Sequence, residues 1–263
     1  MEVFESHALF LGHSSLSSGS FLKNYALQSG NMEAATNMMA KLAAQLLLIL
    51  TVVHANGFVQ GDLKSENVAV VEVAPKEFQI RLIDFDLSAR LELVRAHAGT
   101  RLTISPEVVG AISGPLHEAS DWWSYGVTLL WWSGGIMQGI AEYKKDNSEL
   151  QKWKMWIPET WNRATDEFVL DASAMAQHLP PRIRCFILNF ITDNPSKRRF
   201  IEKNEILQLM KSSLFSSINW NDILKSAFPN SSGGKSISLP TDNIKMAKSV
   251  ESMKVDIDDL EDN

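Results

Sequence analysis

The sequence predicts an α+β fold that is mainly α-helical and is followed by a disordered C-terminal tail. Its 263 residues are 45% apolar and 21% charged, which is enough to bury the core of one large domain or two small ones. Long segments repeat apolar residues with helical spacing, and short β-like segments interrupt them. Aromatic residues are missing from about Ser231 onward, and the stretch from Thr241 to Asn263 carries seven acidic residues against three lysines. We therefore expect this acidic tail to remain unfolded.

The composition argues against several classes of protein. A net charge of −6 speaks against a nucleic-acid partner, because surfaces that bind phosphates are rich in Lys and Arg. The single Cys185 excludes an internal disulfide. The longest apolar run, Leu46 to Val53, is too short for a membrane span, and residues 1–6 show no signal-peptide pattern. These observations favour an intracellular (cytoplasmic) protein.

The first strong element is a helix expected over Met32 to Ala55. It has a continuous apolar face and ends at Asn56-Gly57, residue types that tolerate the left-handed conformation of a helix cap. A polar string from Gln60 to Asn67 follows and leads into a strand at Val68 to Val71, and a second β segment is expected at Phe78 to Ile83. Buried elements on both sides should hold the polar string as a loop on a rigid frame.

Further helices are expected toward the C-terminus, over Ser120 to Trp132, Asp146 to Trp156, Pro181 to Thr192 and Lys203 to Leu214. Pro181 would occupy the first turn of its helix, where its missing N–H has no cost. Cys185 lies in the apolar part of that helix, so we interpret it as a small buried hydrophobic residue.

Asp62, Asn67 and Asp84 each lie at the end of a hydrophobic run, where a helix or strand would anchor them. Phosphoryl transfer needs oxygen ligands for Mg²⁺, a carboxylate that orients the attacking hydroxyl, and a cation beside the transferring phosphate. With Lys64 as the cation, these residues would supply the set. A lone Asp at a turn usually bonds only the backbone, but the combination at this spacing favours the catalytic interpretation.

Five motifs follow one another between about His7 and Trp220. They are Asp62-Leu63-Lys64-Ser65-Glu66-Asn67, Asp84-Phe85-Asp86, the segment Gly99 to Glu107 with Ser105-Pro106-Glu107, Asp121-Trp122-Trp123-Ser124, and Asp193-Asn194-Pro195-Ser196-Lys197-Arg198. In this order they resemble the motifs of the eukaryotic protein kinase superfamily of Ser/Thr type. The resemblance implies a protein-kinase-like fold, of which the chain would form the large C-terminal lobe.

The resemblance also implies a role for each matching residue. Asp62 would be the catalytic base, and Lys64 would stabilise the transferring phosphate. Asn67 and Asp84 would hold Mg²⁺, with Mn²⁺ as an alternative ion, and together with Lys64 they would bind ATP. Thr100 would bond to Asp62 and Lys64 and shape the groove for a protein substrate, which favours a Ser/Thr acceptor.

Three residues would support the fold without taking part in the chemistry. Glu107 would pair with Arg198, and Asp121 would lie buried beneath the catalytic loop. The same resemblance assigns residues 1–18 to a remnant of the N-terminal lobe and hinge, residues 19–228 to the C-terminal lobe, and residues 229–263 to the tail. No Gly-rich loop and no strand lysine are recognisable in the sequence, so we expect slow phosphotransfer, or none, from this polypeptide by itself.

Two departures from the family pattern affect the site. Gln60-Gly61 stands where His-Arg is usual, so the arginine that couples this loop to a phosphorylated activation segment is missing. Activation by phosphorylation of that segment is therefore not expected. Asp86 replaces a glycine, which costs backbone freedom and adds a negative charge near the metal. The extra carboxylate could raise metal affinity or distort the loop.

Three functions remain open at this point. The first is a protein Ser/Thr kinase, and the second is a catalytically impaired pseudokinase or kinase fragment that acts as a binding or scaffold module for a protein partner. The third is a small-molecule phosphotransferase, which Gly61-Asp62 and Ile83-Asp84-Phe85-Asp86 fit but which the other motifs do not. Trp153 and Trp156 lie where kinases often contact partners, and they suggest a docking region.

Overall fold

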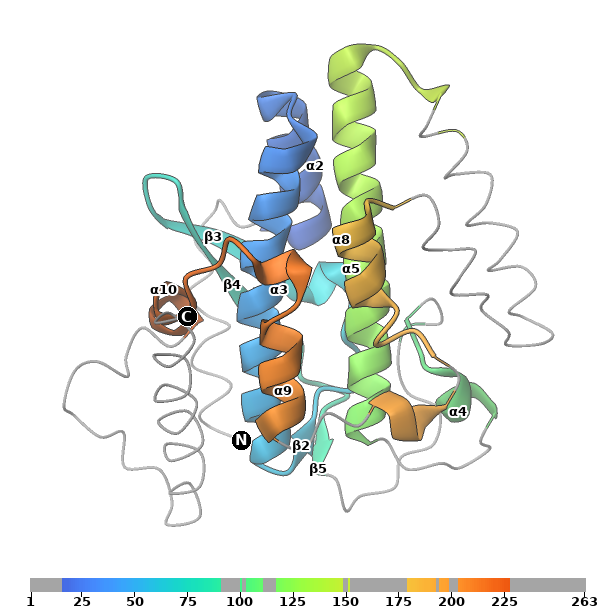
Figure 1. The fold of residues 1–263 in the computed structure, drawn as a ribbon. Coiled ribbons are helices and arrows are strands. Elements are labelled where there is room, and N and C mark those ends of the chain that lie inside the picture. Colours follow the sequence, from blue (N-terminus) through green and yellow to red (C-terminus); the bar gives the residue numbers. More distant parts are fainter. Residues whose placement is uncertain are drawn as a thin grey trace.

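The computed structural model describes residues 16–90, 100, 103–110, 117–148, 151, 179–192, 194–198 and 203–227, and helices dominate this part of the chain (Figure 1). The helices are α2 (Ser18–Ser29), α3 (Met32–Ala55), α4 (Pro106–Gly110), α5 (Glu118–Lys144), α8 (Pro181–Ile187), α9 (Lys203–Met210) and α10 (Trp220–Ala227). Short 3₁₀ turns are η1 (Ser65–Asn67), η2 (Pro195–Arg198) and η3 (Ser213–Phe215). The mainly helical α+β fold expected from the sequence is confirmed.

Helix α3 forms the centre of the core, and its bounds are those predicted from the sequence. The Asn31 side chain caps its first turn by accepting a hydrogen bond from the Ala34 N–H at 3.1 Å. Gly57, just past its end, has a φ of +76°, a conformation that glycine adopts without strain. By length and composition α3 could cross a membrane, but 67% of its most apolar window is buried inside the protein, as in the core helix of a folded domain.

Helix α5 runs alongside α2 and α3 (Figure 1). Its side chains Trp122, Trp123 and Trp132 are completely buried. Its C-terminal half lies directly on α2, because a Cβ added at Gly139 would meet the Lys23 carbonyl oxygen at only 2.3 Å. The helix therefore continues to Lys144, well beyond the predicted end at Trp132, since close packing on α2 offsets the poor helix propensity of its glycines.

Two small antiparallel sheets frame the polar loop. Strands β1 (Leu16–Ser17), β3 (Val68–Ala74) and β4 (Glu77–Leu82) form one sheet in the order β1-β3-β4. Strands β2 (Phe58–Val59) and β5 (Ala89–Arg90) form the other. Both predicted β segments are therefore present, with bounds shifted by a few residues.

Other expectations from the sequence need correction. Helix α8 ends at Ile187, earlier than predicted, because the Asn189 side chain donates hydrogen bonds to the carbonyls of Cys185 and Phe186 at 3.1 and 2.9 Å. Helix α9 ends at Met210, where the chain turns into η3. Cys185 is exposed, so its interpretation as a buried residue is wrong. It lies on the outer face of α8, while Ile183, Phe186 and Ile187 face the core.

Some expectations fall on residues outside the described ranges. These are the N-terminal remnant up to residue 15, most of the helix expected over 146–156, the docking region at Trp153 and Trp156, and the acidic tail. The division of the chain at residues 18 and 228 stays a prediction.

Candidate active site

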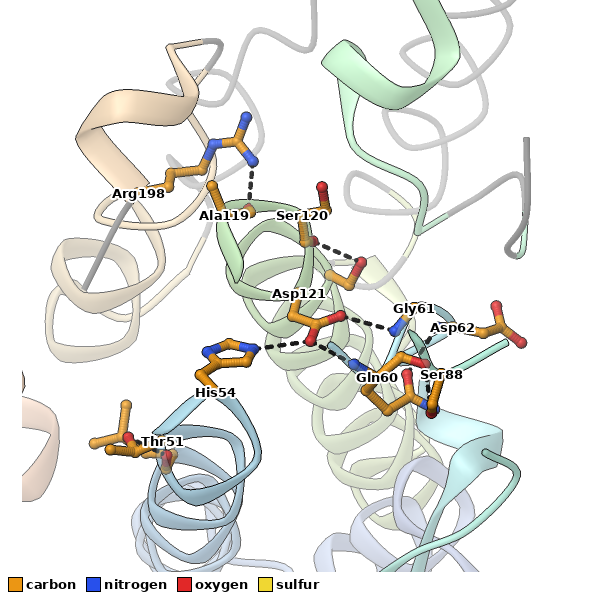
Figure 2. Close-up of polar contacts among 12 residues, drawn as sticks. Thr51, His54, Gln60, Gly61, Asp62, Ser88, Ala119, Ser120, Asp121 and Arg198 are labelled. Carbon is orange, nitrogen blue, oxygen red and sulfur yellow. Dashed lines mark hydrogen bonds and ion pairs between the residues drawn. The ribbon is translucent and has the colours of Figure 1, made fainter. Parts of the chain in front are cut away.

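The carboxylate of Asp121, near the start of α5, anchors the polar loop between β2 and η1 by hydrogen bonds. Asp121 is only 2% exposed, and its Oδ2 accepts the Gln60 N–H at 2.7 Å while its Oδ1 accepts the Gly61 N–H at 3.0 Å (Figure 2). His54 Nε2, at the end of α3, lies 2.8 Å from the same Oδ2. A buried carboxylate with these partners fixes the loop to the two longest helices of the core.

Asp62, Lys64 and Thr100 meet on the loop and form a closed triangle of hydrogen bonds. Lys64 Nζ donates to Asp62 Oδ2 at 2.6 Å and to Thr100 Oγ1 at 2.7 Å. The Thr100 N–H donates to Asp62 Oδ1 at 2.7 Å. The Asp62 side chain is 8% exposed and that of Lys64 is 22% exposed, so the carboxylate is oriented in a partly desolvated setting. The structure thus brings together three of the residues singled out in the sequence.

Asn67 lies beside this triangle, in the turn η1. Its Nδ2 donates to the Asp62 carbonyl at 2.9 Å and to Asp62 Oδ2 at 3.3 Å. Both hydrogen bonds of the side chain to described residues use Nδ2, so Oδ1 is the atom that can face a cation. The hydrogen bonds to Asp62 hold the nearly buried Asn67 side chain in one orientation.

Asp84 follows β4 and reaches the same place through the β3–β4 pairing. The Ile83 N–H donates to the Asn67 carbonyl at 2.9 Å, which puts the residue before Asp84 next to Asn67. Asp84 is exposed and has a φ of +61°, a left-handed conformation that is uncommon for residues other than glycine and that clusters at functional sites. Its Oδ1 accepts the Asp86 N–H at 3.4 Å. The residues proposed for the chemistry, Asp62, Lys64, Asn67 and Asp84, therefore lie near the same end of the β3–β4 hairpin.

The residues present suit Mg²⁺ bound together with a phosphorylated ligand. Among the described residues, no group of three or more His, Cys, Asp or Glu side chains could hold a metal ion by itself. Asn67 and Asp84 offer an amide oxygen and a carboxylate, and Mg²⁺ commonly takes one or two such ligands while phosphates and water complete its octahedron. The chemistry of the donor set fits this incomplete kind of metal site.

Glu107 and Arg198 form an ion pair away from this centre. Arg198 Nη2 lies 2.6 Å from Glu107 Oε2, and Nη1 lies 3.2 Å from Oε1. Arg198 also donates to the Ala119 carbonyl at 2.6 Å and stacks over Trp123, with 5.1 Å between its guanidinium carbon and the ring centroid. Burial by itself would raise the pKa of the Glu107 carboxyl, but the hydrogen bond and charge of Arg198 outweigh it and hold the pKa below its ordinary value.

Two residues, Gln60 and His54, make contacts in the site that were not anticipated from the sequence. The side chain of Gln60, considered only as a departure from a family motif, bonds to both Asp62 and Asp84. His54, near the end of α3, lies within hydrogen-bond distance of Asp121. No periodicity in the sequence predicts the contacts of these two residues. The only indication was that each is a polar residue close to a hydrophobic run.

Comparison with known proteins agrees with this geometry. The family model described as "Protein kinase domain" matches residues 3–212. The chain belongs to the protein kinase family. Members of this family generally use ATP and Mg²⁺.

The curated relatives of this kinase-family chain include ribosomal protein S6 kinases. It is 28% identical over 188 residues to ribosomal protein S6 kinase alpha-3 of Mus musculus, covering 69% of the chain and 22% of that relative. It is 35% identical over 103 residues to ribosomal protein S6 kinase-related protein of Homo sapiens, covering 38% of the chain and 24% of that relative. Ribosomal protein S6 kinase 2 alpha of Xenopus laevis matches at 28% over 188 residues, covering 69% of the chain and 22% of that relative. The chain spans about a fifth to a quarter of the length of these relatives.

Proposed function

We propose that this kinase domain transfers the γ-phosphate of ATP to a Ser or Thr hydroxyl of a protein, with Asp62 as the catalytic base. The observation that carries the proposal is the Asp62–Lys64–Thr100 triangle beside Asn67. Phosphoryl transfer depends mainly on positioning and on charge stabilisation, and both require side chains that are fixed before the substrate arrives. The triangle fixes a base and a cation at once.

Each member of the triangle has a separate task in this proposal. Asp62 accepts the proton of the attacking hydroxyl, using a lone pair that its bonds to Lys64 and Thr100 leave free. Lys64 carries the positive charge that faces the transferring phosphate. Thr100, at the end of the activation segment, ties the substrate-facing part of the chain to Asp62 through its N–H, 2.7 Å away. The acceptor hydroxyl would therefore approach Asp62 at the point where Thr100 fixes the activation segment to this base.

Asn67 and Asp84 would hold the Mg²⁺ ion of Mg-ATP, with Mn²⁺ as an alternative, through Oδ1 and the carboxylate. When bound, the ion neutralises charge on the phosphates. The protein substrate, the cytoplasmic location and a docking role for Trp153 and Trp156 are part of the same proposal.

One observation favours a second candidate, a catalytically impaired domain that serves as a binding or scaffold module. Asp86 occupies a position that is glycine in the family motif, and its N–H donates to Asp84 Oδ1 at 3.4 Å. The added negative charge of the Asp86 side chain near the metal-loop carboxylate would weaken catalysis more than folding.

The two candidates differ in whether phosphate incorporation depends on Asp62. The test uses the full chain with Mg-ATP and a general Ser/Thr substrate protein, and compares Asp62→Asn with the control Asp222→Asn, whose side chain is 71% exposed. We expect Asp62→Asn to lower kcat about 100-fold or more with little change in KM for ATP, because the carboxylate base is lost while Asn67 and Asp84, proposed to hold Mg-ATP, are retained. Equal incorporation by wild type and Asp62→Asn would overturn the proposal in favour of the binding module.

A further inference from the structure

Gln60 lies at the junction of four segments of the site. It is 0% exposed. Its main-chain N–H donates to Asp121 Oδ2 at 2.7 Å, which anchors it to α5. Its carbonyl accepts the Ser88 hydroxyl at 2.9 Å, which joins it to the chain just after the metal loop (Figure 2). The backbone of Gln60 is thus fixed before its side chain makes any contact.

The side-chain amide of Gln60 then connects the loop of the base Asp62 with the loop of the metal ligand Asp84. Oε1 accepts the N–H of Asp62 at 2.8 Å, and Nε2 donates to the carbonyl of Asp84 at 2.9 Å. A primary amide carries an acceptor and a donor on one carbon, so this single group bonds both loops simultaneously. Loss of the amide would leave the buried Asp62 N–H and the Asp84 carbonyl without these partners, and an unpaired buried N–H is costly.

The contact to Asp84 has a particular consequence. Asp84 has a φ of +61°, and a non-glycine residue stays in this region only when its surroundings hold it there. The bond from Gln60 Nε2 fixes the carbonyl of this same residue. Gln60 therefore restrains the peptide plane that follows the metal-loop carboxylate.

We propose that Gln60 is a positioning residue that sets the placement of the metal-loop Asp84 relative to the base Asp62. Its importance for catalysis rests on the proposed function, because phosphotransfer requires the base Asp62 and the metal ligand Asp84 to hold fixed positions relative to each other. Gln60 itself touches no reacting atom. The effect passes through two backbone groups, the Asp62 N–H and the Asp84 carbonyl.

The chain offers a matched control for this proposal. Gln45, on α3, is 2% exposed, and it also makes one donor and one acceptor bond to backbone groups: Nε2 donates to the Phe78 carbonyl at 3.1 Å, and Oε1 accepts the Ile80 N–H at 3.0 Å. Gln45→Met removes the same number of buried hydrogen bonds as Gln60→Met, but it does so at the middle of β4. Any difference between the two variants reflects the position of Gln60.

The experiment measures hydrogen–deuterium exchange and kinetics on the full chain. In Gln60→Met we expect the peptides covering 60–64 and 83–88 to lose protection together by about tenfold, and kcat to fall about 10- to 100-fold, the size of effect that misplaced groups produce. In Gln45→Met the loss of protection should stay in 77–82. Gln60→Asn, which keeps the amide but is one methylene shorter and cannot span both loops, serves if Gln60→Met does not fold, and it should show the same coupled loss.

The outcomes separate the two proposals. Unchanged exchange at 83–88 in both Gln60 variants, or equal kinetic effects of Gln60→Met and Gln45→Met, would overturn the positioning role. If the wild type shows no Asp62-dependent transfer while the coupled loss of protection is observed, the proposed function fails and the Gln60 linkage stands.

Discussion

Removal of the Glu107 carboxylate should destabilise the fold through Arg198. Arg198 is 0% exposed, and it gives both terminal nitrogens to Glu107, at 3.2 and 2.6 Å. In Glu107→Ala its guanidinium keeps the Ala119 carbonyl and the Trp123 ring, while Nε already has no hydrogen-bond partner in the described part of the chain. Breaking a buried ion pair typically costs 3–5 kcal/mol, and because the Glu107 side chain is 19% exposed we expect about 2–4 kcal/mol.

The assay is urea unfolding of the full chain, followed by circular dichroism at neutral pH. The control is Glu142→Ala, which breaks an ion pair to Lys23 at 2.7 Å whose side chains are 39% and 31% exposed. Exposed pairs contribute about 0–1 kcal/mol, so the control should change the free energy of unfolding only slightly. A Glu107→Ala variant no less stable than the Glu142→Ala control would refute the reasoning.

The pH dependence of this difference follows from the lowered pKa of Glu107. A carboxyl whose folded pKa lies below its unfolded value contributes stability above the unfolded value, about 4.3 for Glu, and loses it as the pH falls through the folded value. The stability gap between wild type and Glu107→Ala should therefore be constant above about pH 5 and shrink toward more acidic pH. A gap that widens on acidification would contradict this sign.

Two further variants test other parts of the account. Gly139→Ala should lower the free energy of unfolding by about 1–3 kcal/mol, because its Cβ would meet the Lys23 carbonyl oxygen at 2.3 Å, and a thermal melt no lower than that of wild type would contradict the close α2–α5 packing. Thr100→Val keeps the N–H bond to Asp62 but removes the acceptor of Lys64 Nζ, so kcat should fall about tenfold with an unchanged melting temperature. An unchanged kcat would show that Lys64 needs no help from Thr100.

Local patterns in the sequence predicted the elements whose signals are local. Helix α3 has the predicted bounds because an apolar face of helical period lies between an Asn cap and an Asn-Gly end. The two β segments and the grouping of Asp62, Lys64, Asn67 and Thr100 also agree with expectation. These residues lie close in sequence or belong to motifs that resemble one family.

Features that depend on contacts between distant segments could not be predicted. The end of α5 is decided by α2, whose backbone covers Gly139. The exposure of Cys185 depends on which face of α8 meets the core, and a seven-residue helix gives too few turns to define that face. The role of Gln60 depends on the Asp62 loop, the metal loop and α5 all contacting this one residue, and no pattern along the sequence indicates these contacts.

The most direct test of the central claim is the rate of phosphoserine and phosphothreonine formation by the full chain in the presence of Mg-ATP, with and without the Asp62 carboxylate. We predict slow formation in the wild type, as expected for a polypeptide in which no Gly-rich loop and no strand lysine are recognisable. This formation should stop when Mg²⁺ is chelated and fall about 100-fold or more in Asp62→Asn. Phosphate incorporation that is unaffected by Asp62→Asn, or incorporation that needs no divalent ion, would contradict this prediction.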